Sequence, residues 1–186
     1  MTLFRSPIIV LDTETTGFPR QPWARVIELA AVLIDHDGNE VDSWSSLILP
    51  DILDDRAADA MAVNRITREM LQGQPSAFSA AASFRGWMGD APPYVTSFNV
   101  AFDRPMCERT GLTSLRWASC VMERAMVAMG DACPRFDDGR PKWPKLSDAA
   151  AHFGVPVVGD AHRALTDART AAGIMVAIQR KTHVDS

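Results

Sequence analysis

The stretch Ile8-Ile9-Val10-Leu11-Asp12-Thr13-Glu14 decides how the rest of the chain is interpreted. Its apolar half, 8–11, is typical of a central strand that is buried on both faces. Two carboxylates follow, and period-two alternation places Asp12 and Glu14 on one face, roughly 7 Å apart along the backbone. The carboxyl end of a central strand is where open α/β sheets hold their ligands. By itself the pair is a weak signal, because the same residue types also begin turns.

The pattern beyond this strand predicts a mixed sheet with helices on both faces. Apolar runs at 26–34 and 41–49 flank the turn sequence Asp35–Asn39, and strands joined by so short a turn are antiparallel. A further strand is predicted at 94–98. Helices are expected at 54–71, 76–88, from after 98 to near Gly111, and at 119–129, 146–153 and 163–180. This order predicts an α/β fold with about five strands, of which the first three are antiparallel.

The composition is that of an ordinary globular protein. The chain has 186 residues (20.4 kDa), 47% of them hydrophobic and 23% charged, which points to one domain and argues against a disordered or collagen-like chain. No apolar run approaches the ~20 residues of a membrane span, and the run near the N-terminus is too short for a signal peptide. The three cysteines form neither a disulfide framework nor a zinc pattern. We therefore expect a cytoplasmic protein without a membrane partner.

The net charge of −4 limits how this chain can bind nucleic acid. A protein that holds long nucleic acid by non-specific contacts usually presents a basic face. If nucleic acid is a partner here, a metal ion or a few placed side chains must meet its phosphates.

Two more polar clusters follow predicted elements. In Asn99-Val-Ala-Phe-Asp103, Asn99 is a candidate helix N-cap, and residues four apart share a helix face. Pro105 is comfortable only in a first turn, so either the helix begins nearer Asp103 or its start is distorted. In His162-Arg-Ala-Leu-Thr-Asp167, five residues correspond to about 140° of helix, so both side chains reach one site only if His162 precedes the helix that contains Asp167. A histidine before a helix is otherwise usually a surface residue.

Together these clusters favour a metal-dependent hydrolase. Asp12, Glu14, Asp103 and Asp167 offer only oxygen ligands, which select hard cations such as Mg²⁺ or Mn²⁺ over zinc. Four acids and one histidine on a loop, His162, fit a site that holds two such ions.

The motifs resemble those of a known family. Asp12-Thr-Glu14-Thr-Thr-Gly, Asn99-x-x-x-Asp103 and His162-x-Ala-x-x-Asp167-Ala, in this order, resemble the three exonuclease motifs of the DnaQ-like 3′–5′ exonucleases. The spacing of His162 resembles the DEDDh subgroup. The similarity spans about residues 7–178. It implies a ribonuclease H-like fold and a single exonuclease domain over residues 1–186.

The resemblance also implies roles for individual residues. It assigns two metal ions to the four acids, and it makes His162 the general base in hydrolysis of the last phosphodiester at a 3′ end. Thr15 and Phe18 would touch the terminal nucleotide, with Phe18 as an apolar wedge against the base. The full set of implied substrate-binding residues is Thr15, Thr16, Gly17, Phe18 and Asn99.

The chain departs from the family pattern at two places. Phe98 stands where relatives often have His before the Asn, and Asn64-Arg65 stands where they often have His-Gly. These departures leave the catalytic residues intact and bear on substrate preference.

A loop over residues 134–144 allows two interpretations. Its Trp143 has basic neighbours in the sequence, namely Arg135, Arg140, Lys142 and Lys145. An aromatic ring among cations can stack a nucleobase while the cations hold phosphates. Asp137 and Asp138 dilute the positive charge, which favours a solvated loop instead.

Three functions compete at this point. The leading one is a free-standing 3′–5′ exonuclease that releases nucleoside monophosphates from single-stranded DNA, RNA or short oligonucleotides. A proofreading or repair subunit bound to a polymerase is less favoured, because the chain ends soon after the last predicted helix. A catalytically silent nucleic-acid-binding module is opposed by the intact acids and His162. The sequence leaves open a homodimer and the choice between DNA and RNA.

Overall fold

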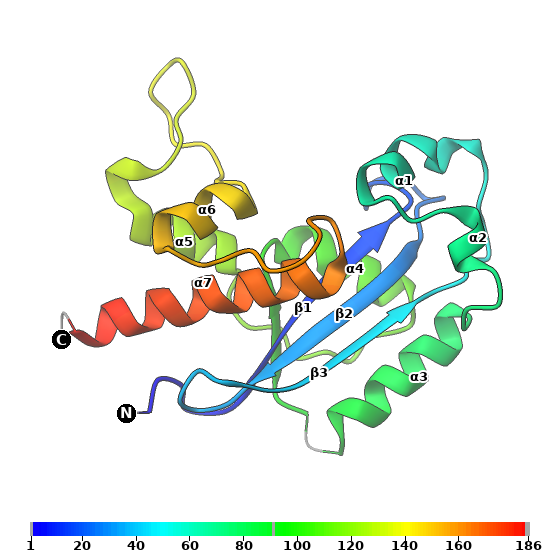
Figure 1. Cartoon of the computed structure of the whole chain (residues 1–186), viewed down its shortest axis with the longest axis horizontal. Helices are drawn as coiled ribbons and strands as arrows, with labels where there is room; N and C mark the ends of the chain where they lie inside the picture. The colour runs from blue at the N-terminus through cyan, green and yellow to red at the C-terminus, as the bar shows by residue number, and fades with distance from the viewer. Residues whose placement is uncertain (1, 91, 185–186) are drawn as a thin grey trace.

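One mixed sheet organises the computed structural model, which describes residues 2–90 and 92–184 (Figure 1). Its strands, in the spatial order β3-β2-β1-β4, are β1 (Ile8–Thr15), β2 (Val26–Ile34), β3 (Glu40–Leu47) and β4 (Tyr94–Ser97). β1 pairs with β2 and β2 with β3 antiparallel, whereas β4 runs parallel to β1. The apolar run that begins β1 therefore lies in an inner strand, as its sequence predicts.

The sheet has four strands within the described residues, one fewer than the five expected. The place of a fifth strand, beside β4, is taken by a single bridge between Trp117 and Val95. The amide of Val95 donates to Arg116 O and that of Ala118 to Val95 O. Pairing ends there, because the chain turns into a helix at Val121. The predicted α/β fold is confirmed, with one strand fewer in the described sheet.

Helices cover both faces of the sheet (Figure 1). They are α1 (Ala58–Asn64), α2 (Arg68–Leu71), α3 (Ala77–Met88), α4 (Val100–Arg109), α5 (Val121–Met129), α6 (Leu146–Phe153) and α7 (Ala164–Val184), with 3₁₀ turns at Asp55–Ala57 and Gly130–Ala132. None of the helices in the described part of the chain is long and apolar enough to cross a membrane.

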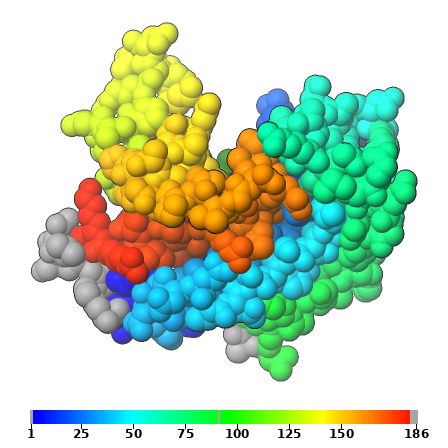
Figure 2. Space-filling model, in the orientation of Figure 1, coloured from blue at the N-terminus to red at the C-terminus, as the bar shows by residue number. Residues whose placement is uncertain are grey.

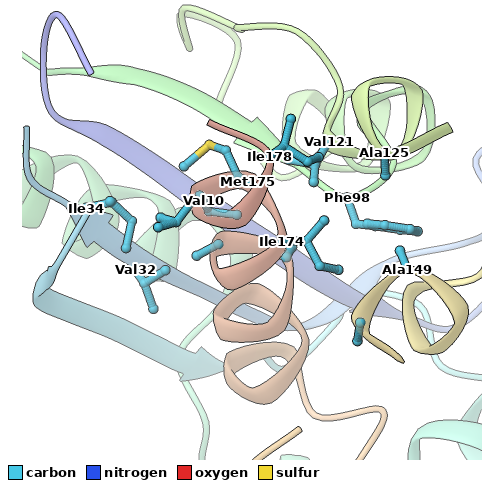
Figure 3. Packing of buried hydrophobic residues seen from close by; sticks show 14 of the residues in the cluster. Val10, Val32, Ile34, Phe98, Val121, Ala125, Ala149, Ile174, Met175 and Ile178 are labelled. Atoms are coloured by element: carbon cyan, nitrogen blue, oxygen red, sulfur yellow. The ribbon is translucent and has the colours of Figure 1, made fainter. Parts of the chain in front are cut away.

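Alternation along β1 divides the core into two layers. Ile9 and Leu11 pack with α3 and α4 on one face. Val10 points to the other face, where it packs with α5, α6 and α7, and Ile174 of α7 lies in that cluster (Figure 3). Because strand side chains alternate, Asp12 and Glu14 continue the Val10 row and Thr13 continues the row of Ile9 and Leu11. The end of β1 thus presents carboxylates beneath the start of α7.

Two helical predictions are corrected by the structure. The helix expected at 54–71 is broken, because Arg65 adopts a left-handed conformation (φ 58°) and ends α1, after which Thr67 caps α2. Pro105 lies inside α4, which begins at Val100, so the alternative of a helix starting nearer Asp103 is wrong. The proline has no amide to donate to the carbonyl four residues earlier, and its ring crowds that carbonyl.

Candidate active site

Asp12 and Glu14 are held side by side at the end of β1. Antiparallel pairing of β1 with β2 fixes both backbones, and Glu14 is paired in register with Glu28 of β2. Residues that are paired in this way point to the same face of the sheet. Three acids therefore share the end of the sheet that α7 covers.

Asp103 reaches the same place from the opposite face. Helix α4 begins directly after β4, and Asp103 is in its first turn with only 3% of its surface exposed. The amide and the hydroxyl of Thr13 both donate to Asp103 Oδ1, at 3.1 and 2.7 Å. Because Thr13 lies between Asp12 and Glu14, these bonds tie the Asp103 carboxylate to the acid-bearing part of β1.

His162 and Asp167 complete the group from the start of α7. The helix begins at Ala164, so Asp167 is in its first turn, whereas His162 precedes it with a left-handed backbone (φ 61°). This is the arrangement that their five-residue spacing requires. Potential ligand atoms of Glu14, His162 and Asp167 all lie within 4.8 Å of one another.

Burial, and for Asp12 and Glu14 also the neighbouring charges, raises the pKa values of these carboxylates. Burial raises the pKa of Asp12 well above its ordinary range, and the neighbouring charges, first that of Asp103, raise it further. Burial also raises the pKa of Glu14 to about 8, with Asp167 and Glu28 adding to the shift. Burial raises the pKa of Asp103 as well, although its hydrogen bonds favour the charged form. Such a cluster is stabilised by any cation that replaces the protons.

The chemistry of these donors fits hard divalent ions. Asp12, Glu14, Asp103 and Asp167 supply carboxylate oxygens, the ligands that Mg²⁺ and Mn²⁺ prefer. The buried cysteines are Cys107, Cys120 and Cys133, and none of them belongs to the Glu14–His162–Asp167 group. The acid cluster is thus suited to magnesium or manganese and poorly suited to a thiolate-bound metal.

An apolar cavity of about 280 Å³ adjoins the carboxylates. Its lining comes from the β1 end, α1 and α4: Glu14, Thr15, Gly17, Phe18, Asp59, Ala60, Val63, Asn64 and Phe102. Phe18 is 57% exposed and meets Phe102 edge to face, with ring centroids 6.4 Å apart. The cavity therefore offers aromatic rings beside the acids. In Figure 2 the surface is hollowed between the α1 region and the chain that leads into α7.

The predicted substrate-binding residues divide into two groups. Thr15, Gly17 and Phe18 line the cavity. Thr16 is buried instead, and its hydroxyl accepts a hydrogen bond from the Arg25 amide at 2.8 Å, so it fastens the loop after β1. Asn99 precedes α4 without a side-chain cap hydrogen bond. Neither of these two is among the residues around the cavity.

Sequence reasoning gave too little weight to three residues. Asn64, noted only as a departure, is buried and donates to Thr15 O at 3.3 Å while accepting from Ile66 N. Glu28 is buried behind Glu14 and forms an ion pair with Arg163. The available signal for Glu28 was a lone carboxylate inside an apolar strand. For Arg163 it was a cation directly after His162.

The loop at 134–144 projects away from the sheet (Figure 1). Its cations are occupied close by: Arg135 pairs with Asp131, Arg140 with Asp138, and Arg140 and Lys142 lie over the Phe136 ring. Trp143 is 52% exposed. These contacts accord with the interpretation as a solvated loop, which the sequence favoured.

Known proteins resemble this chain over nearly its whole length. A family model described as RNase_T, exonuclease, matches residues 9–175. The protein named "Uncharacterized exonuclease CP81" of Escherichia phage 186 is 34% identical over 183 residues, which cover 92% of this chain and 88% of that protein.

Solved structures share the fold at lower sequence identity. Exonuclease I of Methylocaldum szegediense superimposes with a TM-score of 0.76 at 19% identity, covering 96% of this chain and 41% of that one. E. coli exonuclease I in complex with a dT13 oligonucleotide gives 0.73 at 20% identity, covering 97% and 43%. Exonuclease X in complex with 5′-overhanging duplex DNA gives 0.71 at 22% identity, covering 95% and 93%. The chain thus spans about two fifths of the exonuclease I chains and nearly all of exonuclease X.

Proposed function

The chain belongs to the RNase_T family of exonucleases, and from this premise we propose that it is a DEDDh-type 3′–5′ exonuclease. It hydrolyses the terminal phosphodiester of single-stranded DNA or RNA and releases nucleoside monophosphates. The observation that carries the proposal is the meeting of Asp12 and Glu14 with Asp103 and Asp167, from three separate elements, around His162 and beside an apolar cavity.

The four carboxylates would hold two divalent cations, Mg²⁺ or Mn²⁺. When bound, such ions stabilise the charge that develops on the attacking and the leaving oxygen of a phosphodiester. The support in this chain is electrostatic. Its acids have raised pKa values and the net charge is −4, so the site needs added cations before it can accept phosphate.

His162 would act as the general base. Its side chain is exposed while Asp167 and Glu14 beside it are half-buried, so the imidazole can meet a water molecule arriving from solvent. A neutral ring nitrogen would take the proton of that water as its oxygen attacks phosphorus, and the bond from phosphorus to the 3′ oxygen of the preceding nucleotide would break. The terminal nucleotide then leaves with the phosphate.

The apolar cavity would receive the terminal nucleoside. Phe18 and Phe102 offer ring faces and edges to a base, an interaction worth roughly 1–3 kcal/mol per base in single-strand-binding proteins. Thr15 and Gly17 border the same cavity. A single-stranded end suits this arrangement, since an unpaired base can enter a pocket without prior unstacking of a duplex.

The decisive test is digestion of matched 5′-labelled DNA and RNA strands with Mg²⁺ or Mn²⁺, sampled over time. We expect a ladder that shortens from the 3′ end, no reaction in EDTA, and resistance of a circular strand or a 3′-phosphate. Early release of labelled mononucleotide would show digestion from the 5′ end and contradict the proposed direction. Cutting of the circular strand would indicate an endonuclease. The strand that is digested faster shows whether DNA or RNA is the preferred substrate.

His162→Ala tests the general base in the same assay. It should retain metal binding and lose on the order of 10²–10⁴-fold in rate. Wild-type speed at saturating metal would remove His162 from the mechanism.

A further inference from the structure

Glu28 and Arg163 form a partly buried ion pair beside the carboxylates. The Glu28 side chain is 6% exposed, and the Arg163 side chain is 38% exposed. Arg163 Nε lies 3.3 and 3.1 Å from the two carboxylate oxygens of Glu28, and Nη2 lies 2.7 Å from Oε1. This fork uses both oxygens of Glu28, the geometry in which an arginine–carboxylate pair is strongest and most directional.

The bridge also fixes the first residue of α7. The amide of Ala164 donates to Glu28 Oε2 at 3.1 Å, so one carboxylate on β2 holds a side chain and a backbone amide of consecutive residues. The negative charge of Glu28 at the N-terminus of α7 also interacts favourably with the positive end of the helix dipole. The start of α7 is thereby tied to the sheet at the level of Glu14, with which Glu28 is paired.

His162 immediately precedes these anchored residues in a strained conformation. Its φ of 61° is left-handed, which costs a residue with a side chain roughly 1–2 kcal/mol. Across the turn, Gly159 lies close against α7, where an added Cβ would come within 2.6 Å of Thr166 Oγ1. Such a conformation persists only where its surroundings impose it, and the anchored residue next to it is Arg163.

We propose that Glu28 and Arg163 are positioning residues that hold His162 beside Glu14 and Asp167, with Glu28 kept out of the metal-ligand set by its arginine. The proposal rests on the proposed role of His162 as general base. We call Glu28, Arg163 and the Ala164 amide the clamp. On this proposal the clamp determines the rate of hydrolysis and not the binding of the nucleotide.

A second arginine–glutamate pair on α7 provides a matched control. Arg169 forks onto Glu40 with Nε at 3.0 and 3.1 Å and Nη2 at 2.7 Å. Its partner is more exposed, at 34%, and neither residue belongs to the acid group. The two bridges therefore differ in location and burial and hardly at all in geometry.

The test compares Arg163→Met, Arg163→Lys and Arg169→Met in the full chain. Arg163→Met should lower kcat about 10–100-fold, the usual effect of losing a residue that orients a catalytic group, with KM little changed. Arg163→Lys should recover part of the rate, and Arg169→Met should equal wild type. Hydrogen–deuterium exchange without metal should be faster over residues 159–164 in Arg163→Met only.

Combination with His162→Ala separates positioning from general damage. If the clamp acts through His162, Arg163→Met should slow the His162→Ala enzyme no further. Additive losses, or an unchanged metal-free exchange rate together with wild-type kcat, would overturn the proposal. If Arg163→Met melts below the assay temperature, the double variant Glu28→Gln/Arg163→Met is used in its place, because it leaves no unpaired carboxylate buried at Glu28.

The outcomes distinguish this proposal from the proposed function. If His162→Ala is slow and Arg163→Met is as fast as wild type, the clamp fails alone. If His162→Ala is as fast as wild type, the general base fails, and exchange over 159–164 then decides whether the clamp orders the loop. A fall in metal affinity in Glu28→Gln, read from the Mn²⁺-induced rise in Tm, would make Glu28 a ligand and overturn its assignment.

Discussion

Helix α7 has two parts with opposite characters. Its first turn carries Asp167 among acids that repel one another, next to the strained His162. Further along, Ile174 and Met175 are fully buried against the sheet (Figure 3). The contrast teaches how the fold tolerates its candidate site: the apolar part supplies the burial that holds the charged part in an unfavourable place. Substitutions in the two parts should therefore separate activity from stability.

Asp167→Ala should have the largest effect, and on activity alone. Loss of a metal ligand removes charge stabilisation worth several kcal/mol, on the order of 10³-fold or more in rate. The melting temperature in EDTA should stay level or rise, because burial raises the pKa of Asp167 and one repelling carboxylate disappears. Rate measurements check the predicted loss of activity, and thermal melts in EDTA check the predicted stability. A variant that is inactive because it is unfolded would contradict the comparison.

Ile174→Ala should show the reverse pattern. Removing a fully buried side chain from the apolar part costs about 2–5 kcal/mol of unfolding free energy. The rate of the folded enzyme should remain near wild type at low temperature, since the first turn of α7 is untouched. Urea denaturation measures the loss, with Val127→Ala, at a residue 79% exposed, as the control that should change little.

The pH dependence of stability in the metal-free protein should come from the acid cluster formed by the end of β1 and the start of α7. Because the pKa of Glu14 is raised from 4.5 to about 8, its contribution to stability is fully present below about pH 4.5 and is lost as the pH rises through about 8. The free energy of unfolding in EDTA should fall across this range, by on the order of a few kcal/mol, and the melting temperature should fall with it. Glu14→Gln should flatten the profile. Melting temperatures that increase toward pH 8 would contradict the sign.

The same linkage predicts how metal acts. Mn²⁺ replaces protons on the acids, so its stabilising effect should grow as the pH rises from about 6 to about 8.5. A metal-induced rise in Tm that is independent of pH would place the ion elsewhere.

Arg169→Gln should have the smallest effect. Its bridge to Glu40 lies between the two parts of α7 and is partly exposed, and such pairs contribute about 0–1 kcal/mol. The small loss should shrink further at high salt, which screens exposed charges. A loss of more than about 2 kcal/mol would show that this bridge also anchors the helix.

Much of this arrangement was predictable from local sequence. The run at Ile8–Leu11 predicts the inner strand, the turn at Asp35–Asn39 predicts the antiparallel pair, and the motif resemblance to exonucleases is confirmed by the family match. Each of these signals resides in residues that are near one another in the chain or in a motif of fixed spacing.

The rest of the site could not be predicted, because it depends on contacts between distant residues and on backbone geometry, which the periodicity of the sequence does not encode. Glu28 and Arg163 are 135 residues apart and become partners only when α7 lies over β2. Asn99 has the residue type of a helix cap, yet its side chain makes no cap bond, since backbone geometry decides whether the oxygen can reach. Arg65 shows the same limit, because left-handed φ at a residue with a side chain contradicts local preference.

The candidate ligands Asp12 and Asp167 lie near opposite ends of the chain, on β1 and α7. A ribosome delivers the chain from its N-terminus, so a nascent protein that already contains the β-sheet still lacks Asp167 and His162. The candidate site would then be complete only once α7 has docked on the sheet.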